Sequence, residues 1–284
     1  MSKKLLNIII PTLIINAASH LLIQIKWRLA GENGADLVLA QTPREDGVAN
    51  RGVMIYLVAG CGNQPEQAFE FLMPDLVDYG VTYVNYRPDR GCDMRLIANQ
   101  VVADIKQHNY QKVLVIGCSI GDYVGRVCEA ELGDRVYTIA INPEPDSSLL
   151  KPWAKVATRV GVPIGILLTT AAGWVSQWQL YSDCENHFSF DFMVSQFGQI
   201  GFRHDAPKAC DNLLGIIVAE PDVDDKGEDE FLQGREAMRA YFDNIVVYSA
   251  VGAGHGNTVK GASAYKEAWD KLWAVAKPAF ESGI

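Results

Sequence analysis

Short apolar runs alternate with amphipathic stretches along most of the chain after residue 50. Residues 53–59 are continuously apolar and end at Gly60, which is typical of a strand buried on both faces of a sheet. The later segments carry apolar residues either in short runs or at a spacing of three and four, and Pro74 predicts a kink in the first helix. We predict further strands at residues 81–86, 113–116, 135–141, 213–219 and 245–249, and helices at residues 65–79, 95–108, 120–132, 228–242 and 263–276.

The order of these elements predicts an α/β fold with a mostly parallel sheet. The connections between successive strands are too long for hairpins, so the strands run parallel and the helices cover both faces of the sheet. Residues 35–40 are a further candidate, for an edge strand. A chain of 284 residues that is 49% hydrophobic can bury the core of one such domain with an insertion.

The alternation breaks at residues 143–211, which we interpret as an inserted cap. Most of its aromatic side chains would form the cap's own core, and a minority would line a pocket for an apolar acyl group. The predicted organisation is therefore a hydrophobic N-terminal segment, 1–26, and one domain, 27–284, that contains the cap. The aromatic residues of the cap are Trp153, Trp174, Trp178, Tyr181, Phe188, Phe190, Phe192, Phe197 and Phe202.

The apolar stretch at residues 5–25 has three interpretations. It is long enough to cross a bilayer and follows Lys3 and Lys4, but several polar residues interrupt it. A membrane anchor, a cleaved secretory signal and a buried helix followed by a strand all fit this pattern. Attachment to a membrane through residues 5–25, or export, is favoured over a cytoplasmic location.

Charge and cysteine spacing exclude two classes of function. A formal charge of -9 and the absence of a Lys/Arg cluster argue against a nucleic-acid partner. The six cysteines include no C-x-x-C pair and no Cys/His spacing suited to zinc, so we predict no metal site.

Residues 117–121 form a G-x-S-x-G motif at the point where a predicted strand gives way to a helix. A serine on such a sharp turn needs small residues two positions to either side, and Gly117 and Gly121 supply them. A serine hydroxyl is a weak nucleophile, so it also needs a base and a group that orients the base. Ser119 is the predicted nucleophile.

His255 is the predicted general base. It lies in a glycine-rich loop directly after the strand at residues 245–249, where the carboxyl ends of parallel strands gather. The other four histidines, at positions 20, 108, 187 and 204, do not follow a predicted strand of the sheet.

The orienting acid is expected after the preceding strand, residues 213–219. Asp222 is the first choice there, followed by Asp224 and Asp225. Glu144 and Asp146, which follow the strand at residues 135–141, are further alternatives.

Two backbone N–H groups are predicted to form an oxyanion hole. Ile120 follows the serine at the start of a helix, and Cys61 follows the turn Ala59-Gly60 after a strand. Both N–H groups would face the negative charge that develops during acyl transfer.

With these residues the chain resembles the α/β-hydrolase superfamily, and within it the serine esterases and lipases. The resemblance runs from residue 52 to the end, apart from the cap, and rests on residues 117–121, the turn at 59–62, Asp222 and His255. It implies an eight-stranded type of sheet, a nucleophile elbow, a variable cap and no cofactor.

The resemblance implies hydrolysis of carboxylic esters through an acyl-enzyme intermediate. Peptidase, thioesterase and acyltransferase chemistry, and a non-catalytic binding role, are the alternatives. The chain departs from the family pattern at two places. Ala59 replaces the usual histidine before the oxyanion turn, and Asp122 stands where a small residue is common. A carboxylate at position 122 that pointed inward would oppose an oxyanion.

Overall fold

The computed structural model describes the core of the predicted domain. The described residues are 18, 25, 34–43, 52–60, 63–86, 93–144, 148–156, 177–178, 188–189, 207, 211–220, 235–243, 245–255 and 262–282. Most of segment 1–26 and of the cap at 143–211 lies outside them, as do Cys61, Asp146 and the three candidate acids at 222, 224 and 225. Among the helices that are described, none is long and apolar enough to span a bilayer.

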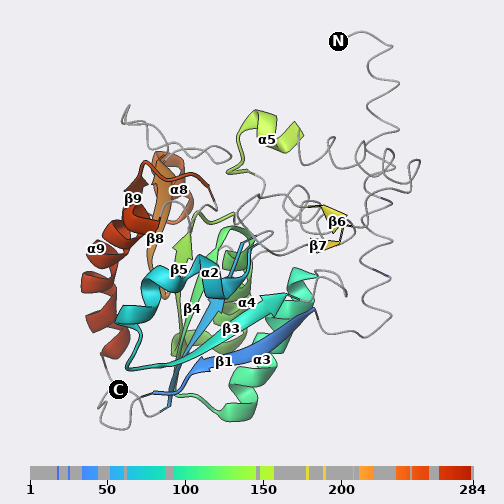
Figure 1. Cartoon of the computed structure of the whole chain (residues 1–284), viewed down its shortest axis with the longest axis vertical. Coiled ribbons are helices and arrows are strands. Elements are labelled where there is room, and N and C mark those ends of the chain that lie inside the picture. The colour runs from blue at the N-terminus through green and yellow to red at the C-terminus, as the bar shows by residue number, and fades with distance from the viewer. Residues whose placement is uncertain are drawn as a thin grey trace.

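A seven-stranded, mostly parallel sheet organises the described residues (Figure 1). Its strands are β1 (Ala35–Gln41), β2 (Val53–Val58), β3 (Gly80–Tyr86), β4 (Lys112–Cys118), β5 (Val136–Ile141), β8 (Leu213–Glu220) and β9 (Val247–Val251). They lie in the order β1-β3-β2-β4-β5-β8-β9, and only the pairing of β1 with β3 is antiparallel. The predicted α/β fold class is confirmed. The edge strand predicted at residues 35–40 is also confirmed, as β1.

Burial explains why the central strands read as uninterrupted apolar runs. All six residues of β2 are buried, whereas the edge strand β1 exposes part of its length. A strand covered on both faces cannot alternate apolar with polar residues, because both sets of side chains enter the core. The sheet therefore forms the centre of the hydrophobic core.

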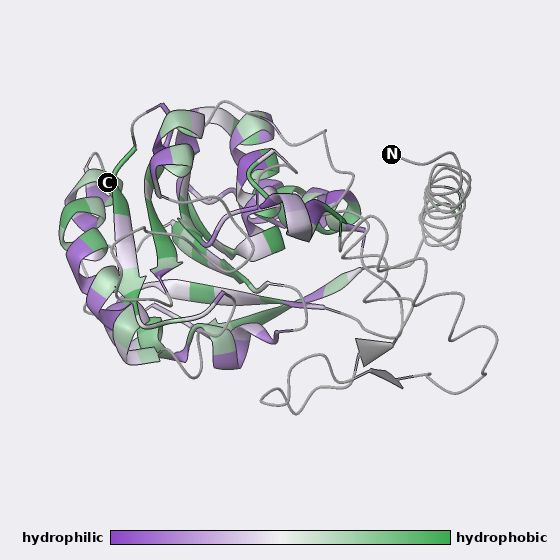
Figure 2. Cartoon of the chain, turned by 90° about the horizontal axis from the view of Figure 1, so that it is seen from above, coloured by the Kyte–Doolittle hydropathy of each residue, from purple (hydrophilic) through white to green (hydrophobic). Residues whose placement is uncertain are grey.

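Helices cover the two faces of this sheet. In β5, the Thr138 hydroxyl donates to Glu129 of α4 (Asp122–Leu132), while the Tyr137 ring contacts Phe280 of α9 (Ala262–Glu281). Neighbouring residues of a strand point to opposite faces, so α4 and α9 lie on opposite sides of the sheet. Helix α3 (Met94–His108) packs beside α4. Figure 2 shows that the helices carry both apolar and polar residues, as expected of helices with one face on the sheet and one in solvent.

The kinked helix predicted at residues 65–79 is wrong. The structure has a short helix α2 (Pro65–Ala68) and a separate 3-10 helix (Glu70–Asp75) in its place. Pro74 lies inside the second piece, where it has no N–H to donate and its ring crowds the preceding turn. The apolar spacing identified the buried face correctly, because Phe69 and Leu72 are fully buried.

Four further short elements are present among the described residues. Three of them lie in the predicted cap, namely α5 (Pro152–Val156) and the antiparallel pair β6 (Gln177–Trp178) and β7 (Phe188–Ser189). Helix α8 (Arg235–Tyr241) lies before β9. The extent of the cap and the domain boundaries stay predictions.

Candidate active site

The turn after β4 holds Ser119 in a strained backbone conformation. Ser119 begins a single 3-10 turn (Ser119–Gly121) that leads directly into α4. Its φ angle is 53°, in the left-handed region that costs a non-glycine residue about 1–3 kcal/mol. The sharp strand-to-helix turn predicted from the G-x-S-x-G motif is therefore present, and it places the serine just beyond the carboxyl end of a central strand.

Packing around the turn explains the two glycines of the motif. A Cβ at Gly121 would lie 2.3 Å from the carbonyl oxygen of Val58, and one at Gly117 would lie 2.6 Å from the backbone nitrogen of Asp122. Gly60 approaches from the next strand, where an added Cβ would lie 3.0 Å from Ser119 Cβ. No larger residue fits at 117 or 121, and the turn after β2 lies directly against the serine.

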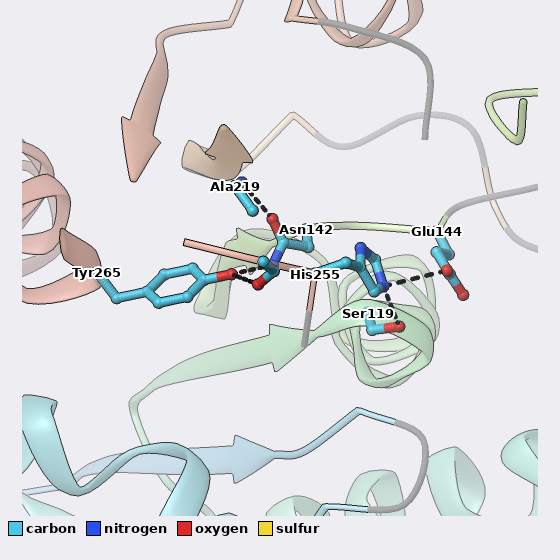
Figure 3. Close-up of polar contacts among 7 residues, drawn as sticks. Ser119, Asn142, Glu144, Ala219, His255 and Tyr265 are labelled. Carbon is cyan, nitrogen blue, oxygen red and sulfur yellow. Dashed lines mark hydrogen bonds and ion pairs between the residues drawn. The ribbon is translucent and has the colours of Figure 1, made fainter. Parts of the chain in front are cut away.

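Ser119 and His255 meet at this edge of the sheet (Figure 3). The Oγ of Ser119 lies 3.2 Å from the Nε2 of His255, and the two residues are 4% and 7% exposed. Their sequence separation is 136 residues, so the contact depends on the whole sheet. With the ring proton on Nδ1, Nε2 can accept the serine proton at this distance.

The chain reaches His255 through a tight turn after β9. Gly252 has a φ of 81°, which favours glycine, and its N–H donates to the carbonyl oxygen of Glu220 at 2.7 Å. Glu220 ends β8, and its carboxylate accepts a hydrogen bond from the Ser249 hydroxyl of β9. These contacts tie the start of the His255 loop to the neighbouring strand.

Glu144 is the carboxylate that the described residues bring to His255. It follows β5, is 5% exposed, and its Oε1 lies 3.3 Å from His255 Nε2 (Figure 3). An orienting acid of a catalytic triad contacts the other ring nitrogen, Nδ1. Glu144 was an alternative for that role, but it shares Nε2 with the serine instead.

Two predicted site residues cannot be placed in the same way. Asp222 and Cys61 lie outside the described residues, so their roles stay predictions. Ile120 is fully buried and directly follows Ser119 in the 3-10 turn, which is the position that the oxyanion prediction requires.

The carboxylate of Asp122 forms a buried ion pair with Arg126. Its Oδ2 accepts a hydrogen bond of 2.8 Å from Nε of Arg126, one turn further along α4, and both side chains are almost completely buried. The guanidinium also donates to the carbonyl oxygen of Pro207 at 2.6 Å and lies 4.6 Å from the centre of the Phe242 ring. The positive charge of the Arg126 guanidinium therefore compensates the negative charge of Asp122, the residue that departs from the family pattern.

A series of buried hydrogen bonds lies beside His255, and the sequence did not predict it. Asn142, with a φ of 47°, links β5 to β8 and donates through Nδ2 to the Tyr265 hydroxyl at 2.6 Å. That hydroxyl donates to the carbonyl oxygen of Gly254 at 2.9 Å. An asparagine directly after a strand was a usable signal, because it tolerates a left-handed backbone. Nothing in the local pattern distinguished Tyr265 from other apolar positions of its helix.

No other nucleophile or metal centre emerges within the described ranges. They contain no group of three or more His, Cys, Asp or Glu residues placed to hold a metal ion. Cys118 and Cys128 are buried thiols that form no disulfide, and burial raises the pKa of Cys128 well above its usual range. A thiol held protonated in this way is a poor nucleophile.

Comparisons with known proteins point to one fold. No family model matches the chain, and no curated protein matches it. A carboxylesterase structure from the thaumarchaeon Nitrososphaera gargenis is similar at a TM-score of 0.58 and 14% identity, over 87% of this chain and 97% of that one. A lipase-esterase related protein from Clostridium acetobutylicum matches at 0.58 and 14%, over 84% and 99%. An enol-lactonase from Burkholderia xenovorans matches at 0.57 and 14%, over 85% and 98%.

Proposed function

Because this chain has the α/β-hydrolase fold, we propose that it is a serine hydrolase that cleaves carboxylic esters. The observation that carries the proposal is the distance of 3.2 Å between Ser119 Oγ and His255 Nε2. A nucleophile and a base within hydrogen-bond reach, on a strained turn at the carboxyl edge of the sheet, are what acyl transfer requires.

The first half of the reaction forms an acyl-enzyme. Ser119 Oγ attacks the ester carbonyl carbon while its proton passes to Nε2 of His255. The tetrahedral oxyanion is held by the N–H of Ile120 and, as predicted from the sequence, by that of Cys61. When the carbon–oxygen bond of the ester breaks, the imidazolium returns the proton to the departing alcohol.

The second half repeats these steps with water. His255 takes a proton from water, the hydroxide attacks the acyl carbon, and Ser119 Oγ leaves with the proton from Nε2. Each turnover therefore consumes one ester and one water and needs no further reactant. The proposal includes no cofactor.

Two carboxylates have different parts in this proposal. Asp222, in the segment after β8, would accept a hydrogen bond from the Nδ1–H of His255 and so orient the ring. Glu144 lies 3.3 Å from Nε2 and so favours the imidazolium over the neutral ring. Its negative charge stabilises the charged ring after proton transfer, but it also opposes loss of the Nε2 proton in the resting enzyme.

The structural neighbours support an ester as the substrate class. They are described as carboxylesterases, a lipase-esterase related protein and an enol-lactonase. Lactones are cyclic esters, so the same acyl chemistry would act on both kinds of substrate. The preference for apolar acyl groups stays a prediction, because most of the aromatic cap residues lie outside the described part of the chain.

A fluorophosphonate probe tests the proposal. It phosphonylates an activated serine, so wild-type protein should be labelled and lose its activity on short-chain esters. Ser119→Ala should abolish both labelling and turnover. Ser282→Ala, which removes an exposed hydroxyl at the end of α9 that donates to the carbonyl oxygen of Ala279, is the matched control and should be labelled like the wild type. Labelling that persists in Ser119→Ala contradicts the assignment.

A further inference from the structure

We propose that Tyr265 is a positioning residue that holds the His255 loop in register with Ser119, and that Asn142 fixes the direction of its hydroxyl. The proposal rests on the proposed function, because it assigns Tyr265 a part in the same site. The Tyr265 hydroxyl donates to the carbonyl oxygen of Gly254, the residue directly before His255, so it acts through the backbone of the loop.

Asn142 is fixed by the ends of two strands. Its backbone N–H donates to the carbonyl oxygen of Ile217 at 2.7 Å, and its Oδ1 accepts from the N–H of Ala219 at 2.6 Å. The residue is fully buried. Because β8 occupies the amide oxygen, the amide nitrogen must face the other way, toward Tyr265.

This orientation determines where the tyrosine proton goes. The Tyr265 hydroxyl has one proton, and it accepts a hydrogen bond of 2.6 Å from Asn142 Nδ2. The proton is therefore available for the carbonyl oxygen of Gly254, 2.9 Å away. In this series of hydrogen bonds each donor has one acceptor, so every bond is donated in the direction from the sheet to the His255 loop (Figure 3).

The loop needs such a restraint because glycine gives it little stiffness of its own. Gly252 and Gly254 flank Ala253 between the end of β9 and His255, and glycine allows many backbone conformations. The Tyr265 hydroxyl on α9 donates to the carbonyl oxygen of Gly254 and so restrains the residue directly before His255. Tyr265 is fully buried, so the hydroxyl itself has little freedom to move.

Tyr265→Phe tests the proposal by removing only the hydroxyl. We expect kcat on a short-chain p-nitrophenyl ester to fall about tenfold to a hundredfold, because small displacements of a catalytic group reduce rate that strongly. KM should stay within about twofold, since substrate contacts are unchanged. A merely structural role would not separate kcat from KM in this way.

Tyr79→Phe is the matched control. Tyr79 is also fully buried and bonds α9, through Glu281, but it lies at the amino end of β3, opposite the active-site edge. Its kcat should stay within about twofold of the wild type, as expected for a distant site. An equal loss of kcat in both variants would overturn the proposal.

A second readout does not depend on turnover. Diethylpyrocarbonate modifies accessible imidazoles, and mass spectrometry can compare His255 with the half-exposed His108 in the same sample. We expect His255 to react severalfold faster in Tyr265→Phe, with His108 unchanged. If the wild type hydrolyses no ester but this acceleration occurs, the proposed function fails and the positioning role stands. If esters are hydrolysed and neither kcat nor His255 reactivity changes, the positioning role fails.

Asn142→Asp provides an independent variant if Tyr265→Phe does not fold. Aspartate tolerates the left-handed backbone and can still accept from Ala219. Its carboxylate would attract the Tyr265 proton away from Gly254, so the hydroxyl would remain but the loop contact would be lost. The same fall in kcat and rise in His255 reactivity are expected. Wild-type values for both would contradict the proposal.

Discussion

Ser119 and His255 face each other across 3.2 Å, but different kinds of interaction hold the two residues in place. The serine is fixed by its own chain, because a left-handed backbone angle and close packing at Gly117 and Gly121 leave the turn one conformation. The histidine sits on a glycine-rich loop and is surrounded by polar contacts, with Glu144 at its ring and Tyr265 at the neighbouring carbonyl group.

The two residues therefore differ in where their supporting contacts come from along the sequence. Among the described residues, the packing contacts that hold the serine turn come from residues next to it in the chain, from β2 and from the turn after β2. The groups that position the histidine come from the ends of β5 and β8, which are far from it in the chain, and from α9, the next described element after it. We therefore expect substitutions on the serine side to act through the nucleophile and the fold, and those on the histidine side to act on rate and pH dependence.

The largest effect is expected from Ser119→Ala. Removing the nucleophile should lower kcat by about 10⁴-fold or more, because the acyl-enzyme cannot form. Alanine keeps the same backbone, so the free energy of unfolding should change by less than about 1 kcal/mol. Steady-state kinetics and urea unfolding measure the two quantities. Substantial residual turnover in this variant would show that the nucleophile lies elsewhere.

Arg126→Met tests the one buried ion pair on the serine side. It should lower the free energy of unfolding by about 3–5 kcal/mol, because the Asp122 carboxylate is left buried without its guanidinium. Urea unfolding measures the loss. The double variant with Asp122→Asn is the control and should recover much of the stability, since no unpaired charge remains. Wild-type stability in Arg126→Met alone would contradict this role.

Gly121→Ala tests the steric part of the comparison. A Cβ 2.3 Å from the Val58 carbonyl oxygen must push two backbone segments apart, so we expect a loss of about 1–3 kcal/mol in stability. Gly34→Ala is the control, because the nearest atom to its added Cβ is a side-chain carbon of Ile97 at 3.0 Å rather than backbone. Thermal unfolding of both variants measures the difference. Equal melting temperatures would show that the turn has more room than its packing indicates.

Glu144→Gln tests the electrostatic part and has the smallest expected effect. A carboxylate beside Nε2 favours the protonated imidazole, so wild-type kcat/KM should fall as pH decreases toward mildly acidic values. Removing the charge should let His255 stay neutral at lower pH, and the acidic limb should move to lower pH. A pH–rate profile of both proteins measures the shift. An unchanged limb, or one that moves upward, would contradict the role of Glu144.

Most of the fold was predictable because each central strand is buried on both faces. That burial makes apolar runs such as residues 113–116 easy to recognise, and Gly133 marks the end of α4. The segment at 65–79 was predicted as one helix because its apolar spacing is helical. Spacing identifies the buried face, but it does not say whether the turns between buried residues are α or 3-10, which Pro74 decides locally.

The candidate site was predictable only in part, for a related reason. Ser119 and His255 each carry a local signal, a motif for one and a glycine-rich loop after a strand for the other. Which carboxylate contacts which ring nitrogen depends on how β5 and β9 lie across the sheet, and the sequence left Glu144 as one of several choices. The contact between Tyr265 and Gly254 spans two elements and has no local signature at all.

The account depends most on activation of Ser119 by His255, and the rate of fluorophosphonate labelling measures that activation directly. The labelled peptide of the wild-type protein should map to Ser119, and His255→Gln should slow its formation by about 10³-fold or more, because glutamine cannot accept the serine proton. Labelling of Ser119 at the same rate in both proteins would contradict the account, as would labelling that maps to another residue.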